Sequence, residues 1–499
     1  MLRITLPSQR HLTPVQAVSR IAIIGGGFTG ATIARLLALH GQYWPHEVVV
    51  FEPRSSLGAG LAYDTDDPSL RLNVAAHRMR AIPGDPQSFA RWLSESGRLA
   101  RDPRAVADDA IYARRGDFAA FMAEQIWPFL ESGSIKHVRE RVRYVRRQHG
   151  HWQMEGETGT ILDADIVVIA TGHPPPRPPA GLTSALHGHP CFVTDPSRPG
   201  AFQKMRQTDK VFVLGAGLTA LDVVAALRDR GHCGEIMLFS RSGRLPRPQA
   251  AGGFAPHGDF LIGIPKTALS LLRQVRFAVD EVTKNGLPWQ SVFDALRHQG
   301  QAIWQALPLD EQRRLLRHLR RWFEVHRFRM PPQVAELVDR ERATGNLHLC
   351  AGTIVSAVRD RRDIILDIAA RPHGTVEQHR TQWLIVATGP DHENAIGDQP
   401  CLAELEHLGL VVKDRRGLGI ECDQESRALA RDGYPVEDLF IAGPLARGTF
   451  GELTGVPEIA SQAETIVHRI MAMNSATTRT IIIRSGNAAK SAARSGSKD

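Results

Sequence analysis

Residues 21–39 read IAIIGGGFTGATIARLLAL, and residues 47–52 read EVVVFE. The first four residues have the unbroken apolar character of a buried strand, and the three glycines that follow predict a turn. Residues 31–39 then carry apolar side chains at helical spacing, and a second apolar strand ends at Glu52. This order of strand, turn, helix and strand predicts a βαβ unit with parallel strands.

The same order recurs later in the chain. Residues 211–228 read VFVLGAGLTALDVVAALR, and residues 235–240 read EIMLFS. Each unit is followed by a buried-type strand that ends in Ala-Thr-Gly, at residues 165–172 and 383–389. We therefore predict an α/β fold with two Rossmann-like dinucleotide-binding domains.

The order of the segments predicts that the second domain is inserted in the first. Residues 173–179 read HPPPRPP, which favours a stiff connection leaving the first domain. A helical stretch of about 265–342 forms an additional insertion, and a strand at 437–443 with a helix near Pro457 returns to the first domain. The predicted boundaries are 18–200 and 396–473 for the two parts of the first domain and 205–395 for the second, with disordered tails at 1–17 and 474–499.

The first glycine turn has the residues that bind a dinucleotide pyrophosphate. Such a group is held by the unpaired amides at a helix N-terminus. The first two motif glycines, Gly25 and Gly27, let the turn form and the backbone approach, and Gly30 lets helix and strand pack closely. Glu52 lies 22 residues after Gly30 (52 − 30), near the spacing at which a carboxylate reaches a ribose hydroxyl.

The second glycine turn predicts a different nucleotide. Gly215 and Gly217 are followed by Ala220, which the motif allows. The next strand ends in the sequence SRSGR rather than in an acid. A carboxylate would repel a 2′-phosphate, whereas arginine can bind it with two hydrogen bonds. We therefore predict NADPH rather than NADH, with Arg241 as the first candidate for the phosphate contact and Arg244 as the second.

Composition and missing motifs exclude several classes of protein. The charge of +8 is spread along the chain, which favours solubility and anionic cofactors over nucleic acid. We find no run of 18 uncharged apolar residues and no apolar leader, so we expect a cytoplasmic protein without membrane insertion. The five cysteines include no C-x-x-C pair, and G-x-S-x-G, Walker A and H-E-x-x-H motifs are missing. These gaps argue against dithiol-relay, hydrolase, kinase and zinc-protease functions, and no metal site is predicted.

Residues 313–329 predict an arginine-rich amphipathic helix. Its apolar face follows the i, i+1, i+4, i+7, i+8, i+11 pattern, and comprises Leu315, Leu316, Leu319, Trp322, Phe323 and His326. Its arginines lie on the flanks and on the other side. They are either a solvated basic face or a contact with NADPH phosphates or an acidic substrate.

The chain resembles bacterial FAD/NAD(P)-binding proteins related to flavin-dependent N-hydroxylating monooxygenases of amino acids. The resemblance spans roughly residues 20 to 470. It rests on six segments: Gly25 to Gly30, LNVAAHRM at 72–79, ATG at 170–172, SRSGRLP at 240–246, HRFRM at 326–330 and GPLARGTFGELTGVPEI at 443–459. It implies a two-domain flavoprotein in which the first motif and the C-terminal segment bind FAD and the second motif binds NADPH.

The resemblance also implies individual site residues. Many flavoproteins have an aspartate after the last strand that contacts the ribityl chain, but this chain has Pro444. The turn from Thr454 to Pro457 would direct a helix N-terminus at the pyrimidine edge of the flavin. Asn73, the only catalytic candidate, is a flavin- or substrate-facing residue or an ordinary loop cap, and neighbouring His77 and Arg78, like His173, are surface or structural residues or part of the site. The predicted cofactor-binding residues are Gly25, Gly27, Phe28, Thr29, Gly30, Glu52, Asn73, Thr171, Gly172, Gly215, Gly217, Leu218, Thr219, Ala220, Ser240, Arg241, Arg244, Gly389, Gly443, Pro444, Thr454 and Pro457.

Two nucleotide sites in one chain suggest that NADPH reduces a tightly held flavin, which then reacts with something else. The leading hypothesis is an FAD-dependent NADPH oxidoreductase, in particular a monooxygenase that uses O2 and acts on a small polar amine or amino acid. One alternative is a reductase or dehydrogenase with a non-oxygen acceptor. Another is a non-catalytic FAD-binding sensor or assembly protein.

Overall fold

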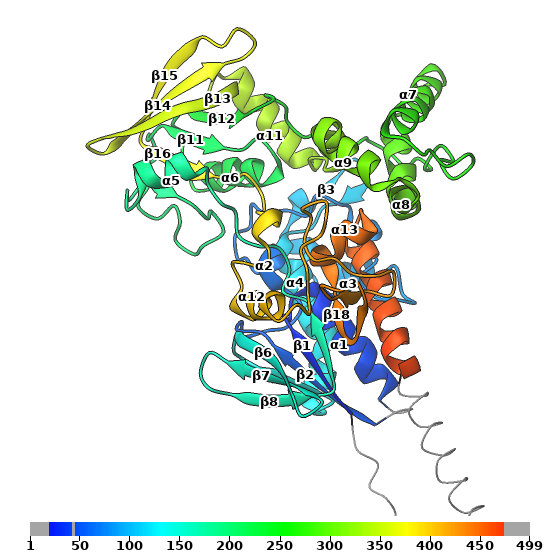
Figure 1. Ribbon diagram of the computed structural model, residues 1–499. Helices are drawn as coiled ribbons and strands as arrows, with labels where there is room; N and C mark the ends of the chain where they lie inside the picture. The colour runs from blue at the N-terminus through cyan, green and yellow to red at the C-terminus, as the bar shows by residue number, and fades with distance from the viewer. Residues whose placement is uncertain (1–18, 42–44, 474–499) are drawn as a thin grey trace, which may run out of the picture.

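The computed structural model describes residues 19–41 and 45–473 (Figure 1). The predicted tails at 1–17 and 474–499 lie outside the described residues. Figure 1 shows two sheets at opposite ends of the molecule, with a group of helices beside the second sheet.

The first sheet has six strands in the order β17-β18-β9-β1-β2-β5, and all except β17 run parallel. The strands are β1 (Ser19–Ile24), β2 (His46–Phe51), β5 (Ile135–Val138), β9 (Ile166–Ile169), β17 (Arg427–Leu429) and β18 (Pro435–Ile441). In the register of β18 with β9, Leu439 lies opposite Val167. The chain therefore returns to the first sheet after the second domain, as the sequence predicts.

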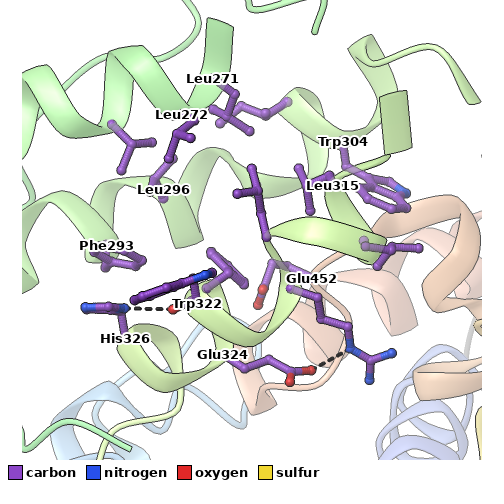
Figure 2. Close-up of a pocket in the computed structure, with 18 of the residues that line it drawn as sticks. Leu271, Leu272, Phe293, Leu296, Trp304, Leu315, Trp322, Glu324, His326 and Glu452 are labelled. Carbon is purple, nitrogen blue, oxygen red and sulfur yellow. Dashed lines mark hydrogen bonds and ion pairs between the residues drawn. The ribbon is translucent and has the colours of Figure 1, made fainter. Parts of the chain in front are cut away.

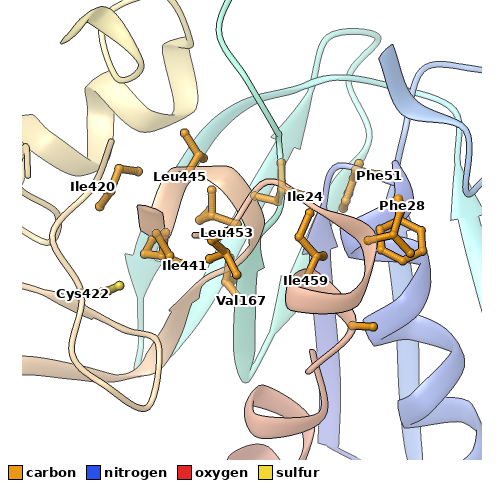
Figure 3. Packing of buried hydrophobic residues seen from close by; sticks show 14 of the residues in the cluster. Ile24, Phe28, Phe51, Val167, Ile420, Cys422, Ile441, Leu445, Leu453 and Ile459 are labelled. Atoms are coloured by element: carbon orange, nitrogen blue, oxygen red, sulfur yellow. The ribbon is translucent and has the colours of Figure 1, made fainter. Parts of the chain in front are cut away.

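Both faces of this sheet are covered, which explains the unbroken apolar run in β1. Ile21 and Ile23 face the helix α1 (Phe28–His40) and a helix over 456–473. Ala22 and Ile24 face the opposite core. Figure 3 shows this second core, with Ile24, Phe51, Val167 and Ile441 from four strands beside Leu453 and Ile459.

The second sheet has seven strands in the order β10-β16-β11-β12-β13-β14-β15. They are β10 (Phe192–Val193), β11 (Val211–Leu214), β12 (Ile236–Ser240), β13 (Leu347–Asp360), β14 (Asp363–Ala370), β15 (Val376–Thr381) and β16 (Trp383–Val386). The first five strands in that order are parallel, and β14 and β15 extend the edge in antiparallel fashion. The sheet is therefore doubly wound with an antiparallel extension, and the predicted fold class is confirmed.

The helix α11 (Pro332–Ala343) belongs to the second domain. Its residues Val334 and Val338 pack in one core with Val223 and Leu227 of α6 (Leu218–Asp229). The structure differs here from the predicted insertion of about 265–342, which includes α11. The sequence could not assign α11 to either unit, because the apolar periodicity of a helix is the same whichever partner the helix packs against.

The helices α7 (Ala268–Lys284), α8 (Gln290–Ala306), α9 (Leu309–His318) and α10 (Arg320–Arg327) form the helical insertion. Part of it has a core of its own, in which Val282 and Val292 are fully buried. The single helix predicted over 313–329 is wrong. Leu319 has φ −109° and ψ −19° and separates α9 from α10, and α10 ends before Phe328.

Shorter elements complete the first domain around α4 (Arg115–Glu131), whose Phe118 and Phe121 are buried. They are α2 (Gly60–Tyr63), α3 (Ser88–Glu95), β3 (Val106–Ala107), β4 (Ala110–Ile111), β6 (Val142–Gln148), β7 (His151–Gly156), β8 (Ile161–Ala164), α12 (Pro400–His407) and α13 (Arg447–Phe450), while α5 (Ala180–Leu186) packs on the second sheet. Within residues 19–41 and 45–473, no helix combines the length and apolarity needed to cross a membrane.

Candidate functional site

The first glycine motif requires glycine for steric reasons that the structure makes explicit. Gly25 has φ +102°, and a Cβ atom there would lie 2.4 Å from the carbonyl oxygen of Ala170 at the end of β9. A Cβ atom on Gly30 would lie 1.9 Å from the carbonyl oxygen of Gly25. The helix α1 begins at Phe28, and no side chain among the described residues caps its first turn. Its amides are thus free to bind a phosphate.

Glu52 organises this turn from the tip of β2. Its Oε2 accepts a hydrogen bond from the amide of Gly26 at 3.0 Å. Its Oε1 accepts from the amide and the guanidinium of Arg54, both at 3.1 Å. Oε2 has a second lone pair, so the predicted ribose contact is compatible with these bonds. Arg54 could not be predicted from the sequence, because nothing in its spacing marks it as a partner of Glu52.

The segments that frame the first site come from three distant parts of the sequence. A Cβ atom on Gly443, after β18, would lie 2.6 Å from Oγ1 of Thr29 in α1. The amide of Gly443 donates to Gln462 in the last helix at 2.7 Å. Buried polar atoms almost always have hydrogen-bond partners, yet Oγ1 of Thr171 and Nδ1 of His173 have none within the described chain. These two atoms after β9 fit a polar cofactor that would supply their partners.

The second glycine motif opens on a cleft of about 1160 Å³. A Cβ atom on Gly217 would meet no atom within 4 Å, and no side chain of the described residues caps the start of α6. The predicted residues that line the cleft are Gly215, Gly217, Leu218, Thr219, Ser240, Arg241, Arg244, Gly389 and Thr454. The structure therefore brings the second motif, the basic strand tip and the start of the last helix to one space. Ala220, by contrast, is fully buried behind the turn.

The two candidate arginines differ in their surroundings. Arg241 is exposed at the rim of the cleft. Arg244 lies with its guanidinium carbon 3.5 Å from the centre of the Trp322 ring in α10. Between the two arginines the chain turns, and Oγ of Ser240 accepts a hydrogen bond from the amide of Gly243 at 3.0 Å that closes this turn. Arg241 is thus the freer of the two to meet a phosphate.

A pair of histidines lines the cleft near the first domain. The rings of His173 and His392 lie 5.3 Å apart in an edge-to-face arrangement. Burial lowers the pKa of His173 to about 4 and the pKa of His392 to about 3, and the positive charge of Arg447 contributes to both shifts. Both rings are therefore neutral at neutral pH. The sequence indicates no definite role for His173. His392 lies outside every motif of the sequence, and nothing in the segment 443–459 marks Arg447 as a neighbour of the two histidines.

Asn73 lies outside the nucleotide cleft. It lines a smaller cavity of about 150 Å³ together with Arg78 and residues of the insertion. Its carbonyl oxygen accepts a hydrogen bond from Gln249 at 2.8 Å. Arg78 forms an ion pair with Asp294 of α8 at 2.7 Å. The predicted Asn73 motif therefore lies where the first domain meets the insertion.

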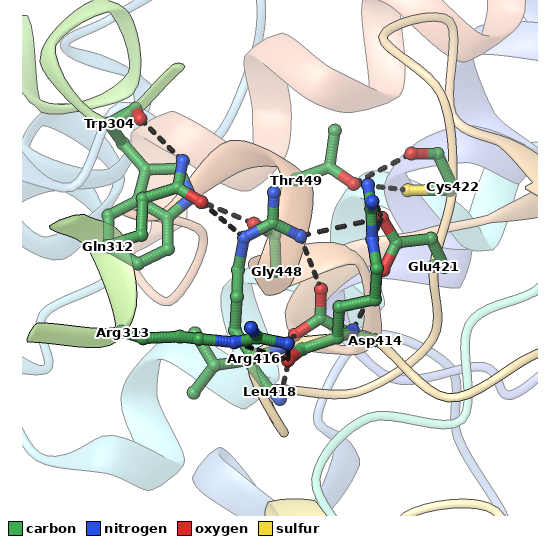
Figure 4. A network of polar contacts seen from close by, with 11 residues as sticks. Trp304, Gln312, Arg313, Asp414, Arg416, Leu418, Glu421, Cys422, Gly448 and Thr449 are labelled. Carbon is green, nitrogen blue, oxygen red and sulfur yellow. Dashed lines mark hydrogen bonds and ion pairs between the residues drawn. The ribbon is translucent and has the colours of Figure 1, made fainter. Parts of the chain in front are cut away.

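A polar network fixes the insertion against the first domain (Figure 4). Nε1 of Trp304 in α8 donates to the carbonyl oxygen of Gly448 at 2.8 Å. Gln312 of α9 donates to the carbonyl of Trp304 at 2.7 Å and accepts from Arg416 at 2.6 Å. Arg416 also pairs with the buried Asp414 at 2.7 Å. These contacts hold α8 beside the segment that follows β18, and α9 beside the segment that precedes β17.

Comparison with known proteins agrees with this architecture. Residues 22–174 match the FAD-NAD(P)-binding family. No curated protein matches the chain in sequence.

Three solved structures extend the match over almost the whole chain. Ornithine hydroxylase from Pseudomonas aeruginosa, in its reduced form, is 16% identical with a TM-score of 0.60, covering 91% of this chain and 98% of its own. L-lysine 6-monooxygenase from Pseudomonas syringae is 17% identical with a TM-score of 0.59 and the same coverage of 91% and 98%. Ornithine N-hydroxylase from Kutzneria sp. 744, with reduced FAD, NADP⁺ and L-ornithine, is 19% identical with a TM-score of 0.58, covering 92% and 100%. Residues 22–174 are thus similar to an FAD-NAD(P)-binding domain, and the chain has the fold that these hydroxylases and this monooxygenase share.

Proposed function

We propose that this protein is an FAD-dependent NADPH oxidoreductase and, within that class, a monooxygenase that acts on an amine or amino acid. One observation carries the proposal. The cleft that begins at the second glycine motif ends at His173 and Thr454, which belong to the framework of the first motif. A nucleotide held at α6 would therefore extend toward a cofactor held at α1.

The residues of each site fit the cofactor assigned to it. FAD would be held by the start of α1, by Glu52 and by the segments after β9 and β18, where Oγ1 of Thr171 has no hydrogen-bond partner among residues 19–41 and 45–473. Bound FAD would supply the two-electron chemistry that the side chains of this chain lack. NADPH would be held by the start of α6, with Arg241 on its 2′-phosphate.

The protein's own groups contribute position and electrostatics. The last helix begins at residue 456, close to Thr454 in the wall of the cleft, so its N-terminal dipole favours negative charge there. The neutral rings of His173 and His392 add bulk without adding charge between the two sites.

The substrate class comes from the matching structures. They are named for ornithine and lysine, and a further match, at 14% identity and a TM-score of 0.57, is a cadaverine monooxygenase from Erwinia amylovora with bound FAD. We infer an amine or amino acid as substrate and O2 as co-substrate. We also infer a cytoplasmic location, which fits the five cysteines, none of which forms a disulfide.

The test begins with anaerobic mixing of FAD-loaded protein with NADPH or NADH. We expect NADPH to bleach the flavin absorbance faster than NADH. Oxygen is then admitted with a panel of amines and amino acids, and hydroxylated product is measured against NADPH consumed. Protein that retains FAD but is not bleached by NADPH would contradict the oxidoreductase. Bleaching with turnover only on quinone or imine acceptors would favour the reductase alternative.

A further inference from the structure

The apolar stripe predicted on residues 313–329 faces a cavity. The cavity has a volume of about 580 Å³ and lies between the four helices of the insertion and the segment after β18 (Figure 2). All six stripe residues line it: Leu315, Leu316, Leu319, Trp322, Phe323 and His326. Sites for small molecules typically enclose about 300–1000 Å³. The cavity is therefore large enough for a ligand.

The opposite wall is apolar as well. Figure 2 shows Leu271 and Leu272 of α7 and Leu296 of α8 on the side of the cavity away from Glu324. Leu271 and Leu272 remain only half-buried, although both point between the helices. Apolar walls that face water or empty space forfeit hydrophobic and dispersion energy, which an apolar ligand would recover.

One end of the cavity meets the nucleotide cleft. Arg320, Glu324 and Arg447 line both spaces. Arg320 and Glu324 lie on α10, and Arg447 follows β18 in the first domain. A ligand in the cavity would thus present one end to the region between the two cofactor sites.

The charges at this shared wall are unequal. Arg320 pairs with Glu324 at 2.7 Å, and Glu452, which lines the cavity, pairs outside it with Arg327 at 3.0 Å. Arg447 lies within ion-pair distance of no carboxylate in the described part of the chain, and its Nε donates only to the carbonyl of Gly451 at 3.3 Å. A partly buried cation without a carboxylate at ion-pair distance is costly, and burial lowers the pKa of Arg447 more than the negative charges of Glu452 and Glu324 raise it. This end of the cavity therefore favours an anionic group.

We propose that the cavity binds an amphipathic carboxylate, with its extended apolar body among α7, α8, α9 and α10 and its carboxylate at Arg447. The inference rests on the proposed function and narrows its substrate class to an amino acid or related acid that carries a large apolar group. This differs from the small polar substrates expected from the sequence. A short polar chain would leave most of the leucine-lined wall in contact with water.

The first experiment measures binding to the FAD-loaded protein by calorimetry. Dodecanoate is the probe, and dodecylamine and L-ornithine are the comparisons. We expect dodecanoate to bind with one-to-one stoichiometry and at least about tenfold more tightly than either comparison. Equal binding of dodecylamine would overturn the role of Arg447, and tighter binding of L-ornithine would overturn the apolar site.

Variants locate the ligand. Leu272→Trp and Leu315→Trp fill the cavity from two helices, and each should weaken dodecanoate binding by about tenfold or more. Leu269→Trp is the matched control, because Leu269 lies on α7, is 53% exposed and does not line the cavity. Unchanged affinity in both cavity variants, or an equal loss in the control, would contradict the site. Arg447→Gln should weaken dodecanoate but not dodecanol, and Arg447→Lys should restore part of the loss.

Anaerobic reduction by NADPH is followed on the same samples, so that the two proposals fail separately. Normal reduction without dodecanoate binding would overturn the cavity assignment alone. Dodecanoate binding without reduction would overturn the oxidoreductase and keep the cavity as a binding site. A loss of NADP⁺ affinity equal to the loss of dodecanoate affinity in Arg447→Gln would assign Arg447 to the nucleotide instead.

Discussion

The guanidinium carbon of Arg244 lies 3.5 Å from the centre of the Trp322 ring. Arg244 follows the second glycine motif along the chain, and Trp322 belongs to α10 of the insertion. Trp322 lines the apolar cavity and Arg244 lines the nucleotide cleft. This stacked pair therefore connects the nucleotide site with the insertion that we propose binds the substrate.

Replacement of Trp322 should weaken NADPH binding indirectly. A cation–π contact at a partly exposed site contributes about 0.5–1 kcal/mol, so Trp322→Ala should raise the KM for NADPH by about two- to fivefold. Trp322→Phe should lose less, because it keeps an aromatic face. Trp127→Ala in α4, a tryptophan that is 61% exposed, is the control. A KM in Trp322→Ala equal to that of the control would show that the stacking does not orient Arg244.

Replacement of Arg241 should discriminate between the two nicotinamide cofactors. Because we assign Arg241 to the 2′-phosphate, Arg241→Ala should raise the KM for NADPH by about tenfold or more and leave the KM for NADH nearly unchanged. Steady-state oxidation of both cofactors measures the ratio. The exposed Arg273 of α7 offers the control variant Arg273→Ala. Equal effects on NADPH and NADH would refute the assignment.

A side chain at Gly27 should abolish flavin binding. A Cβ atom there would already lie 3.2 Å from the Cα atom of Gly60, and the larger Gly27→Val would also block the approach of a pyrophosphate. We expect folded but colourless protein, measured by the flavin absorbance after reconstitution with FAD. Gly397→Val, at an exposed position with open space around the Cβ atom, should remain yellow. A normal flavin spectrum in Gly27→Val would count against the first motif.

Acid should destabilise the protein through His173 and His392. Their pKa values of about 4 and about 3 in the folded protein lie below the usual value of 6.5. Between these pH values the unfolded chain therefore binds more protons than the folded protein. The free energy of unfolding is thus unaffected by the pair above about pH 6.5 and decreases as the pH falls toward 4, by about 1.4 kcal/mol per pKa unit. Urea unfolding at pH 7.5 and pH 5 measures the loss. The variant His173→Gln with His392→Asn should lose less stability between these pH values, and an identical loss would exclude the pair as its source.

Gly451 should be required for the position of Trp304. It has φ +75°, and a Cβ atom would lie 2.7 Å from Cγ of Trp304. Gly451→Ala should cost about 2–4 kcal/mol, part from the left-handed backbone and part from overpacking. Gly433→Ala isolates the backbone part, since Gly433 has φ +86° and open space. Equal free energies of unfolding for the two variants would show that Trp304 can move away from the added Cβ atom without destabilising the protein.

Local patterns in the sequence determined the two βαβ units. Each of these units is recognised from residues that lie close together in the chain: the apolar runs at 21–24 and 211–214, the glycine spacings and the position of Glu52. Their periodicity and steric demands are the same in any context, so they predict β1, α1, β11 and α6. The sequence also predicts that the second domain is inserted in the first, because residues 437–443 have the apolar character of a buried strand and no neighbouring segment could pair with it.

Only the tertiary structure decided which surfaces these elements share. The same apolar spacing describes α11, which packs on the second sheet, and the stripe of α9 and α10, which lines a cavity. His392 belongs to no motif, nothing in the segment 443–459 marks Arg447 as its neighbour, and the two meet only in the wall of the cleft that the folded chain forms. A sequence pattern records that a face is apolar or that a residue is charged. Which atoms meet that face or that charge depends on contacts between residues that lie tens to more than a hundred positions apart in the chain, and those contacts exist only once the chain has folded.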